Sequence, residues 1–152
     1  SAASDVYKRQ VLHIGPQFAR AWYDHDFRVD DVPLAPGAGI YCLTKFMGME
    51  ISRAYAREYG IDTVWFLLNE FGSKPETQQT EASHHPFTLV REDLVTACRL
   101  ALEVEKLPDH YQRFNLNSYL EHGKYTVDKV RRILGYEVGE QLERYFRRPE
   151  NV

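Results

Sequence analysis

Short apolar runs alternate along this chain with longer segments of helical periodicity. The runs at 11–15 (VLHIG), 63–68 (TVWFLL) and 111–116 (YQRFNL) are rich in β-branched and aromatic residues, which predicts buried strands. Residues 40–59 and 91–105 carry apolar side chains at spacings of three and four, which predicts amphipathic helices. Because strands and helices alternate, the sequence predicts an α/β protein with at least partly parallel strands.

Glycines and a threonine mark the ends of the predicted helices. Gly60 follows the first helix, and a third helix is expected from Thr126, its N-cap, to Leu134, with Gly135 as its stop. A further helical stretch is expected over residues 139–147. The apolar stripe of the first helix is expected to consist of Leu43, Phe46, Met47, Ile51, Ala54 and Tyr55.

The polar segments between these elements are predicted to be loops. Residues 16–40 contain several prolines and glycines, and residues 69–86 are almost entirely polar. Long ordered loops of this kind are often functional.

Composition and charge exclude several classes of protein. The 152 residues are 43% hydrophobic and 27% charged, as in one folded domain. The net charge of −3 and the lack of a long basic run argue against a nucleic-acid partner. No apolar stretch approaches the roughly 20 residues that span a bilayer. Without a secretory leader pattern either, we expect a cytoplasmic protein with no membrane partner.

The cysteines and histidines suggest no metal centre. Cys42 and Cys98 lack metal-binding or redox spacing, so we expect two reduced thiols. No histidine and carboxylate set has a recognised ligand spacing, so no metal is expected.

A tyrosine and a lysine one helical turn apart are the strongest chemical candidates. Tyr41 and Lys45 share one face of the first predicted helix. A neighbouring ammonium favours the phenolate form of a tyrosine, and such a tyrosine can exchange a proton with a substrate hydroxyl. The spacing alone is weak evidence, because Tyr125 and Lys129 repeat it.

The sequence around the first pair is far more specific than the spacing. The segment PLAPGAGIYCLTKFMGMEISRAYAREYGIDTVWFLLNEFG resembles the NAD(P)-dependent epimerase/dehydratase family, the extended short-chain dehydrogenases/reductases. FTLVREDLVTACRLALE, with Asp93 at the family's aspartate position, FNLNS and YTVDKVRRILGY continue the resemblance in the same order. The family positions matched near the pair are Tyr41, Lys45, Gly48, Glu50, Ala56, Tyr59, Gly60, Asn69, Phe71 and Gly72.

The resemblance implies a fold and a reaction. The fold would be a partial Rossmann-like one, with a doubly wound and mainly parallel sheet, plus small C-terminal elements of a substrate domain. Tyr41 would transfer the proton, and Lys45 would assist it and bind the nicotinamide ribose of NAD or NADP. Asn69 would lie near a nucleotide-sugar substrate, although it could equally be a simple turn residue. A homodimer through the helix of residues 41–59 is also implied, with Gly48, Ala54 and Ala56 permitting close approach.

Three departures from the family pattern qualify these expectations. The sequence has no Gly-x-x-Gly-x-x-Gly loop for the pyrophosphate. Gly15, Pro16 and Gln17 stand near the place where the family has a serine or threonine, and Phe66 stands near that of an arginine.

Two hypotheses about domain organisation and function therefore remain open. Residues 11–152 are expected to be the C-terminal portion of such an enzyme, lacking the N-terminal nucleotide-binding half and inactive alone. Residues 1–10 are either an artefact, since SDVYKRQ resembles translated adapter sequence, or a short native tail. The alternative is a catalytically degenerate nucleotide-binding or scaffold member of the same fold.

Overall fold

The computed structural model describes residues 10–17, 39–74 and 85–139. Their largest sheet has three parallel strands in the order β1-β2-β5: β1 (Gln10–Pro16), β2 (Asp62–Leu68) and β5 (Tyr111–Asn115). These are the three strands that the apolar runs predict. The expected helix at 139–147 lies, apart from its first residue, outside the described residues.

A second, smaller sheet is not predicted by the sequence. It pairs β3 (Glu70–Gly72) in parallel with β4 (Thr88–Val90). Two strands of three residues are too short to show a period of two, so the pattern of apolar positions does not reveal them.

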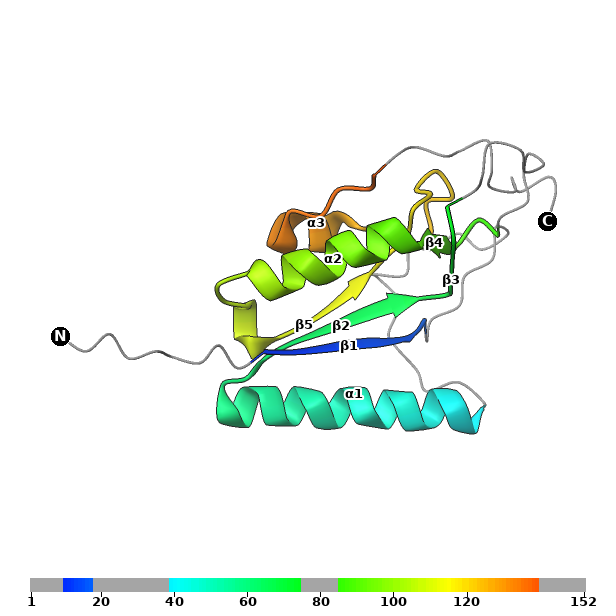
Figure 1. Cartoon of the computed structure of the whole chain (residues 1–152). Helices are drawn as coiled ribbons and strands as arrows, with labels where there is room; N and C mark the ends of the chain where they lie inside the picture. The colour runs from blue at the N-terminus through cyan, green and yellow to red at the C-terminus, as the bar shows by residue number, and fades with distance from the viewer. Residues whose placement is uncertain (1–9, 18–38, 75–84, 140–152) are drawn as a thin grey trace.

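Helices cover both faces of the main sheet (Figure 1). α1 (Ile40–Tyr59) lies on one face, and α2 (Arg91–Glu103) and α3 (Asp128–Leu134) lie on the other. The described residues thus form an α/β arrangement with parallel strands, as expected. Two helix boundaries differ from the prediction: α2 ends at Glu103 and not at residue 105, and α3 is capped by Val127 and not by Thr126.

Alternate residues of β2 build the two halves of the core. Val64, Phe66 and Leu68 pack toward α2 and α3, and Trp65 and Leu67 pack toward α1. All seven residues of β2 are buried. A central parallel strand that is covered on both faces must be apolar throughout, which explains the sequence TVWFLL.

The buried face of α1 differs from the expected stripe. Met49 and Ala56 are fully buried against the sheet, and Cys42 and Phe46 pack beside them. Apolar residues at a spacing of four instead form a row along α1 that is 39% to 60% exposed. We call this row the α1 ridge: Leu43, Met47, Ile51, Tyr55 and Tyr59.

A buried carboxylate joins α2 to the chain that follows β5. Asp93, in the first turn of α2, accepts hydrogen bonds from the Ser118 hydroxyl and from the Gly139 backbone N–H, the latter at 3.0 Å. Ser118 in turn accepts the Val90 N–H at 2.8 Å. A side chain at Gly139 would place its Cβ 2.8 Å from the Asp93 carboxylate, so glycine is needed there.

Candidate active site

The first two turns of α1 present the tyrosine and the lysine together. Gly39 caps the helix with an extended backbone, and Leu43 N–H donates to the Gly39 carbonyl at 2.9 Å. The Tyr41 side chain is 60% exposed, and Lys45 Nζ lies 5.8 Å from the centre of its ring. The pair is therefore formed and open to a ligand.

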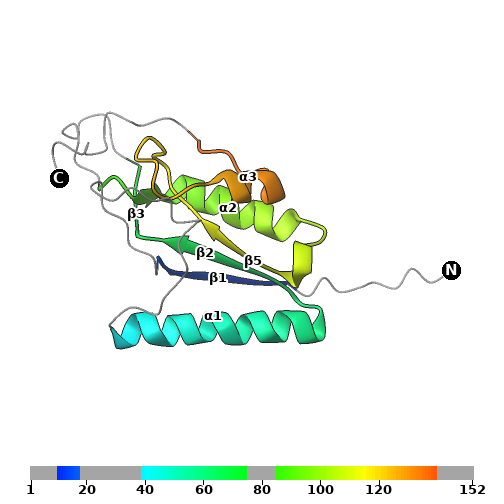
Figure 2. The same cartoon turned by 180° about the vertical axis from the view of Figure 1, so that it is seen from behind.

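The pair lies at the carboxyl end of the sheet. The start of α1 and the tips of β1 and β2 are on the same side of the molecule, and Figure 2 shows the same arrangement from behind. Ligands of open α/β sheets bind outside the carboxyl ends of the strands. Asn69 follows β2 directly at this end and is exposed. Tyr41, Lys45 and Asn69 thus all lie at the carboxyl end of the sheet.

His13 of β1 lies next to α1. Its ring stacks on Trp65 with centroids 4.4 Å apart, and its Nε2 lies 3.5 Å from Ser52 Oγ. Burial lowers the pKa of His13, and the charge of Lys45 lowers it further. β1 is the edge strand among the described residues. Position 13 belongs to no motif, so sequence reasoning missed it.

Gly15 has no side chain and so leaves space for the Trp65 ring that stacks on His13. A Cβ at Gly15 would lie 2.9 Å from the Trp65 ring. An apolar groove of about 320 Å³ runs beside the stack between β1 and α1. Its lining residues are Val11, His13, Ile51, Ser52, Tyr55, Ala56, Ile61 and Thr63.

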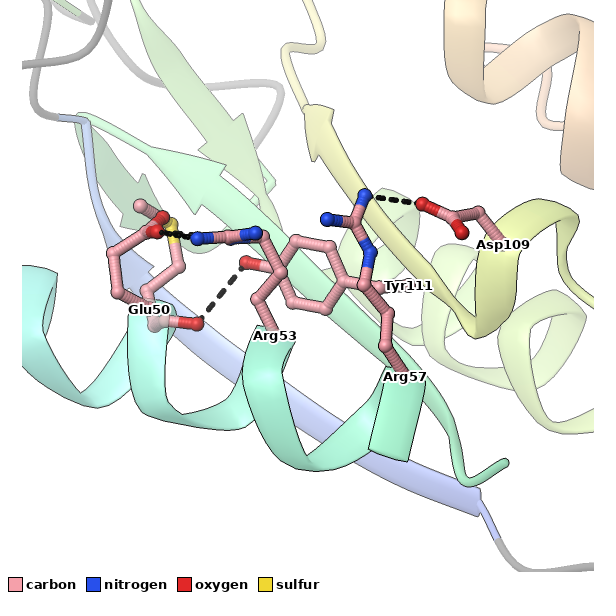
Figure 3. A network of polar contacts seen from close by, with 6 residues as sticks. Glu50, Arg53, Arg57, Asp109 and Tyr111 are labelled. Carbon is pink, nitrogen blue, oxygen red and sulfur yellow. Dashed lines mark hydrogen bonds and ion pairs between the residues drawn. The ribbon is translucent and has the colours of Figure 1, made fainter. Parts of the chain in front are cut away.

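The opposite side of α1 is held against the start of β5 (Figure 3). Tyr111 is buried, and its hydroxyl donates to the Met49 carbonyl at 3.3 Å. Arg57 pairs with Asp109 just before β5. Burial raises the pKa of Tyr111 well above its usual range, so this hydroxyl stays a donor. These contacts hold the helix that carries the pair, and a further ion pair within α1 joins Arg53 to Glu50.

Two positions that depart from the family pattern have packing roles here. Gln17 is buried, and its Nε2 donates to Asn115 Oδ1 at 2.7 Å, across the end of β2. Phe66 is buried against Phe114, with ring centroids 6.2 Å apart. Gln17 thus ties β1 to β5, and Phe66 belongs to the core. Gln17 and Asn115 are 98 positions apart in the sequence, so no local pattern could reveal their contact.

The second tyrosine–lysine pair has a different setting. Tyr125 is 2% exposed, and Lys129 Nζ donates to the Arg113 carbonyl at 2.9 Å. Lys129 also lies over the Phe114 ring, at 5.4 Å from its centre. Equal spacing in the sequence thus produces an exposed pair on α1 and a packed one near α3.

The exposed pair offers a phenol and an ammonium to a ligand. A phenol and an ammonium side by side can bond a ribose and a hydroxyl substrate. Among the described residues no three histidine, cysteine or acidic side chains gather as metal ligands. None of the described helices is long and apolar enough to cross a membrane. A scan against protein-family models and a search of curated proteins found no match.

Proposed function

We propose that this chain is part of an NAD(P)-dependent epimerase/dehydratase-type oxidoreductase that acts on a hydroxyl of a nucleotide-sugar. On this proposal residues 11–152 are the C-terminal portion of a Rossmann-like domain. The observation that carries it is the placement of Tyr41 and Lys45, which lie together and exposed on a helix beside the carboxyl ends of a parallel sheet.

Each site residue has a defined task in this proposal. Tyr41 takes a proton from the substrate hydroxyl or returns one, and the Lys45 ammonium lies beside its ring. Lys45 also bonds the nicotinamide ribose. NAD or NADP, when bound, accepts or returns the hydride. On this proposal Asn69, which directly follows β2, contacts the substrate.

The alternative proposal is a nucleotide-binding or scaffold protein that has lost the reaction. It is favoured by Gln17 and Phe66, which stand near the family's serine or threonine and arginine and are engaged in packing. This alternative keeps cofactor binding and predicts no hydride transfer.

Replacement of the Tyr41 hydroxyl separates the two proposals. In the full-length protein, including any coding sequence before residue 1, Tyr41→Phe should lower turnover of a nucleotide-sugar by about 100-fold or more, since general acid–base groups contribute that much. Tyr59→Phe is the matched control, because Tyr59 is equally exposed on the same helix. Its turnover should stay at the wild-type value. Wild-type turnover by Tyr41→Phe would refute the role of Tyr41.

We also propose a homodimer through α1. The α1 ridge exposes five large apolar side chains along one helix. Single exposed apolar residues are common on protein surfaces, whereas contiguous ones mark interaction sites. Of the small residues expected to permit close approach, Ala56 is buried against the sheet and cannot face a partner. A Cβ added at Gly48 would meet no atom within 4 Å, so this position leaves open space beside the helix.

A further inference from the structure

A histidine is enclosed by aromatic rings in the segment between β5 and α3. His122 is 7% exposed. Its ring meets Phe87, Tyr119 and Tyr125 edge-on, with centroids 4.8, 5.9 and 6.0 Å away. This cluster lies outside the candidate active site, and no step of the proposed reaction uses it.

The hydrogen bond of His122 fixes it in the neutral form. Its Nδ1 accepts the Lys124 backbone N–H at 2.9 Å, so the single proton is on Nε2. Nε2 is buried and has no hydrogen-bond partner in the described part of the chain. A second proton would have to go on Nδ1. A proton on Nδ1 would point at the Lys124 backbone N–H, and Nδ1 could no longer accept a hydrogen bond from it.

The surroundings also disfavour the charged ring. Burial, helped by the charges of Lys124 and His85, lowers the pKa of His122 to about 4. The acid of the same segment, Glu121, accepts the Tyr119 hydroxyl at 3.4 Å. The imidazolium would therefore be buried among rings and beside cationic groups.

Long hydrogen bonds accompany this cluster. Asn117 Nδ2 donates to the Tyr125 carbonyl at 3.3 Å, and the Tyr136 hydroxyl donates to the Asn117 carbonyl at 3.4 Å. Both distances exceed the usual range, so these bonds are weak. The aromatic rings around His122 thus help to hold residues 119–125, together with the bond from the Gly123 N–H to the Leu120 carbonyl at 3.0 Å.

We propose that His122 is an acid-sensitive latch for residues 119–125. The segment stays closed while the imidazole is neutral and opens locally when the imidazole gains a proton. Between the two pKa values the open form binds a proton that the closed form does not, so opening becomes easier as the pH falls from 6.5 toward 4. At neutral pH the latch is closed.

Amide hydrogen exchange at two pH values tests the latch in the 152-residue chain. After correction for the intrinsic pH dependence of exchange, the opening constant of residues 119–125 should rise roughly 50-fold from about pH 7 to about pH 4.5. His122→Phe keeps a ring in the cluster and removes the titrating group, so its corrected opening should change little. His13→Phe, on the opposite face of the sheet, should keep the wild-type rise.

Equal pH dependence in wild type and His122→Phe would overturn the proposal. If His122→Phe does not fold, an NMR titration of wild type decides the question. The His122 imidazole should titrate well below the usual value for histidine, and the amide shifts of residues 119–125 should follow it with the same midpoint. A His122 that titrates near 6.5, the ordinary histidine value, or amides that do not follow it, would also overturn the latch.

Discussion

At the scale of single residues, buried polar side chains are the hardest to substitute, because each forms hydrogen bonds that join distant segments of the chain. Asp93 is 5% exposed and bonds both Ser118 and Gly139, so it links α2 to two segments that are distant in sequence. The sequence singles out Asp93 by its position in a motif and as an acidic residue in the first turn of a predicted helix. The sequence shows Gln17 as a possible hydrogen-bond donor. It does not reveal the partner, Asn115, because their contact depends on the order of the strands in the sheet.

Asp93→Ala should lower the free energy of unfolding by about 3 kcal/mol, since it leaves the Gly139 N–H and the Ser118 hydroxyl without their charged acceptor. Urea unfolding followed by circular dichroism measures this loss. Glu103→Ala is the control. Glu103 pairs with Arg99 on the exposed surface of α2, so its loss should cost less than about 0.5 kcal/mol. Equal losses in the two variants would refute the structural role of Asp93.

At the scale of elements, the sequence predicted α1 and β2 well and the orientation of α1 poorly. The limits of α1, 40 to 59, and the glycine that ends it were predicted because apolar spacing and Gly60 agree, and Gly60 adopts a left-handed φ of 62°. Apart from Phe46, the predicted buried face was wrong, because α1 has apolar residues on two sides. Periodicity cannot tell which of two apolar sides meets the sheet.

The exposed α1 ridge predicts self-association. Ile51→Glu places a charge in the middle of the α1 ridge and should shift the protein from dimer to monomer, as measured by sedimentation velocity. Val95→Glu is the control, because Val95 is exposed on α2, on the other face of the sheet. A monomeric wild type, or a dimer that Ile51→Glu leaves intact, would contradict the proposed interface.

At the scale of the whole molecule, three features support the proposed active site. The sheet is parallel, α1 places Tyr41 and Lys45 at its carboxyl end, and the Tyr111 hydroxyl helps to fix α1 to the sheet. The α/β class was predictable because alternating strand and helix patterns determine it. The side of α1 on which the pair lies was not, because it depends on tertiary packing around His13 and Trp65.

The most direct test of the proposed activity is hydride transfer by the full-length protein. The protein should be mixed with NAD⁺ or NADP⁺ and a set of UDP-, GDP- and dTDP-sugars while the absorbance of the reduced nicotinamide is recorded. Our proposal predicts that reduced cofactor forms with at least one of these sugars and that Tyr41→Phe abolishes the change. Cofactor that binds and is never reduced would contradict the enzyme proposal and favour a nucleotide-binding or scaffold protein.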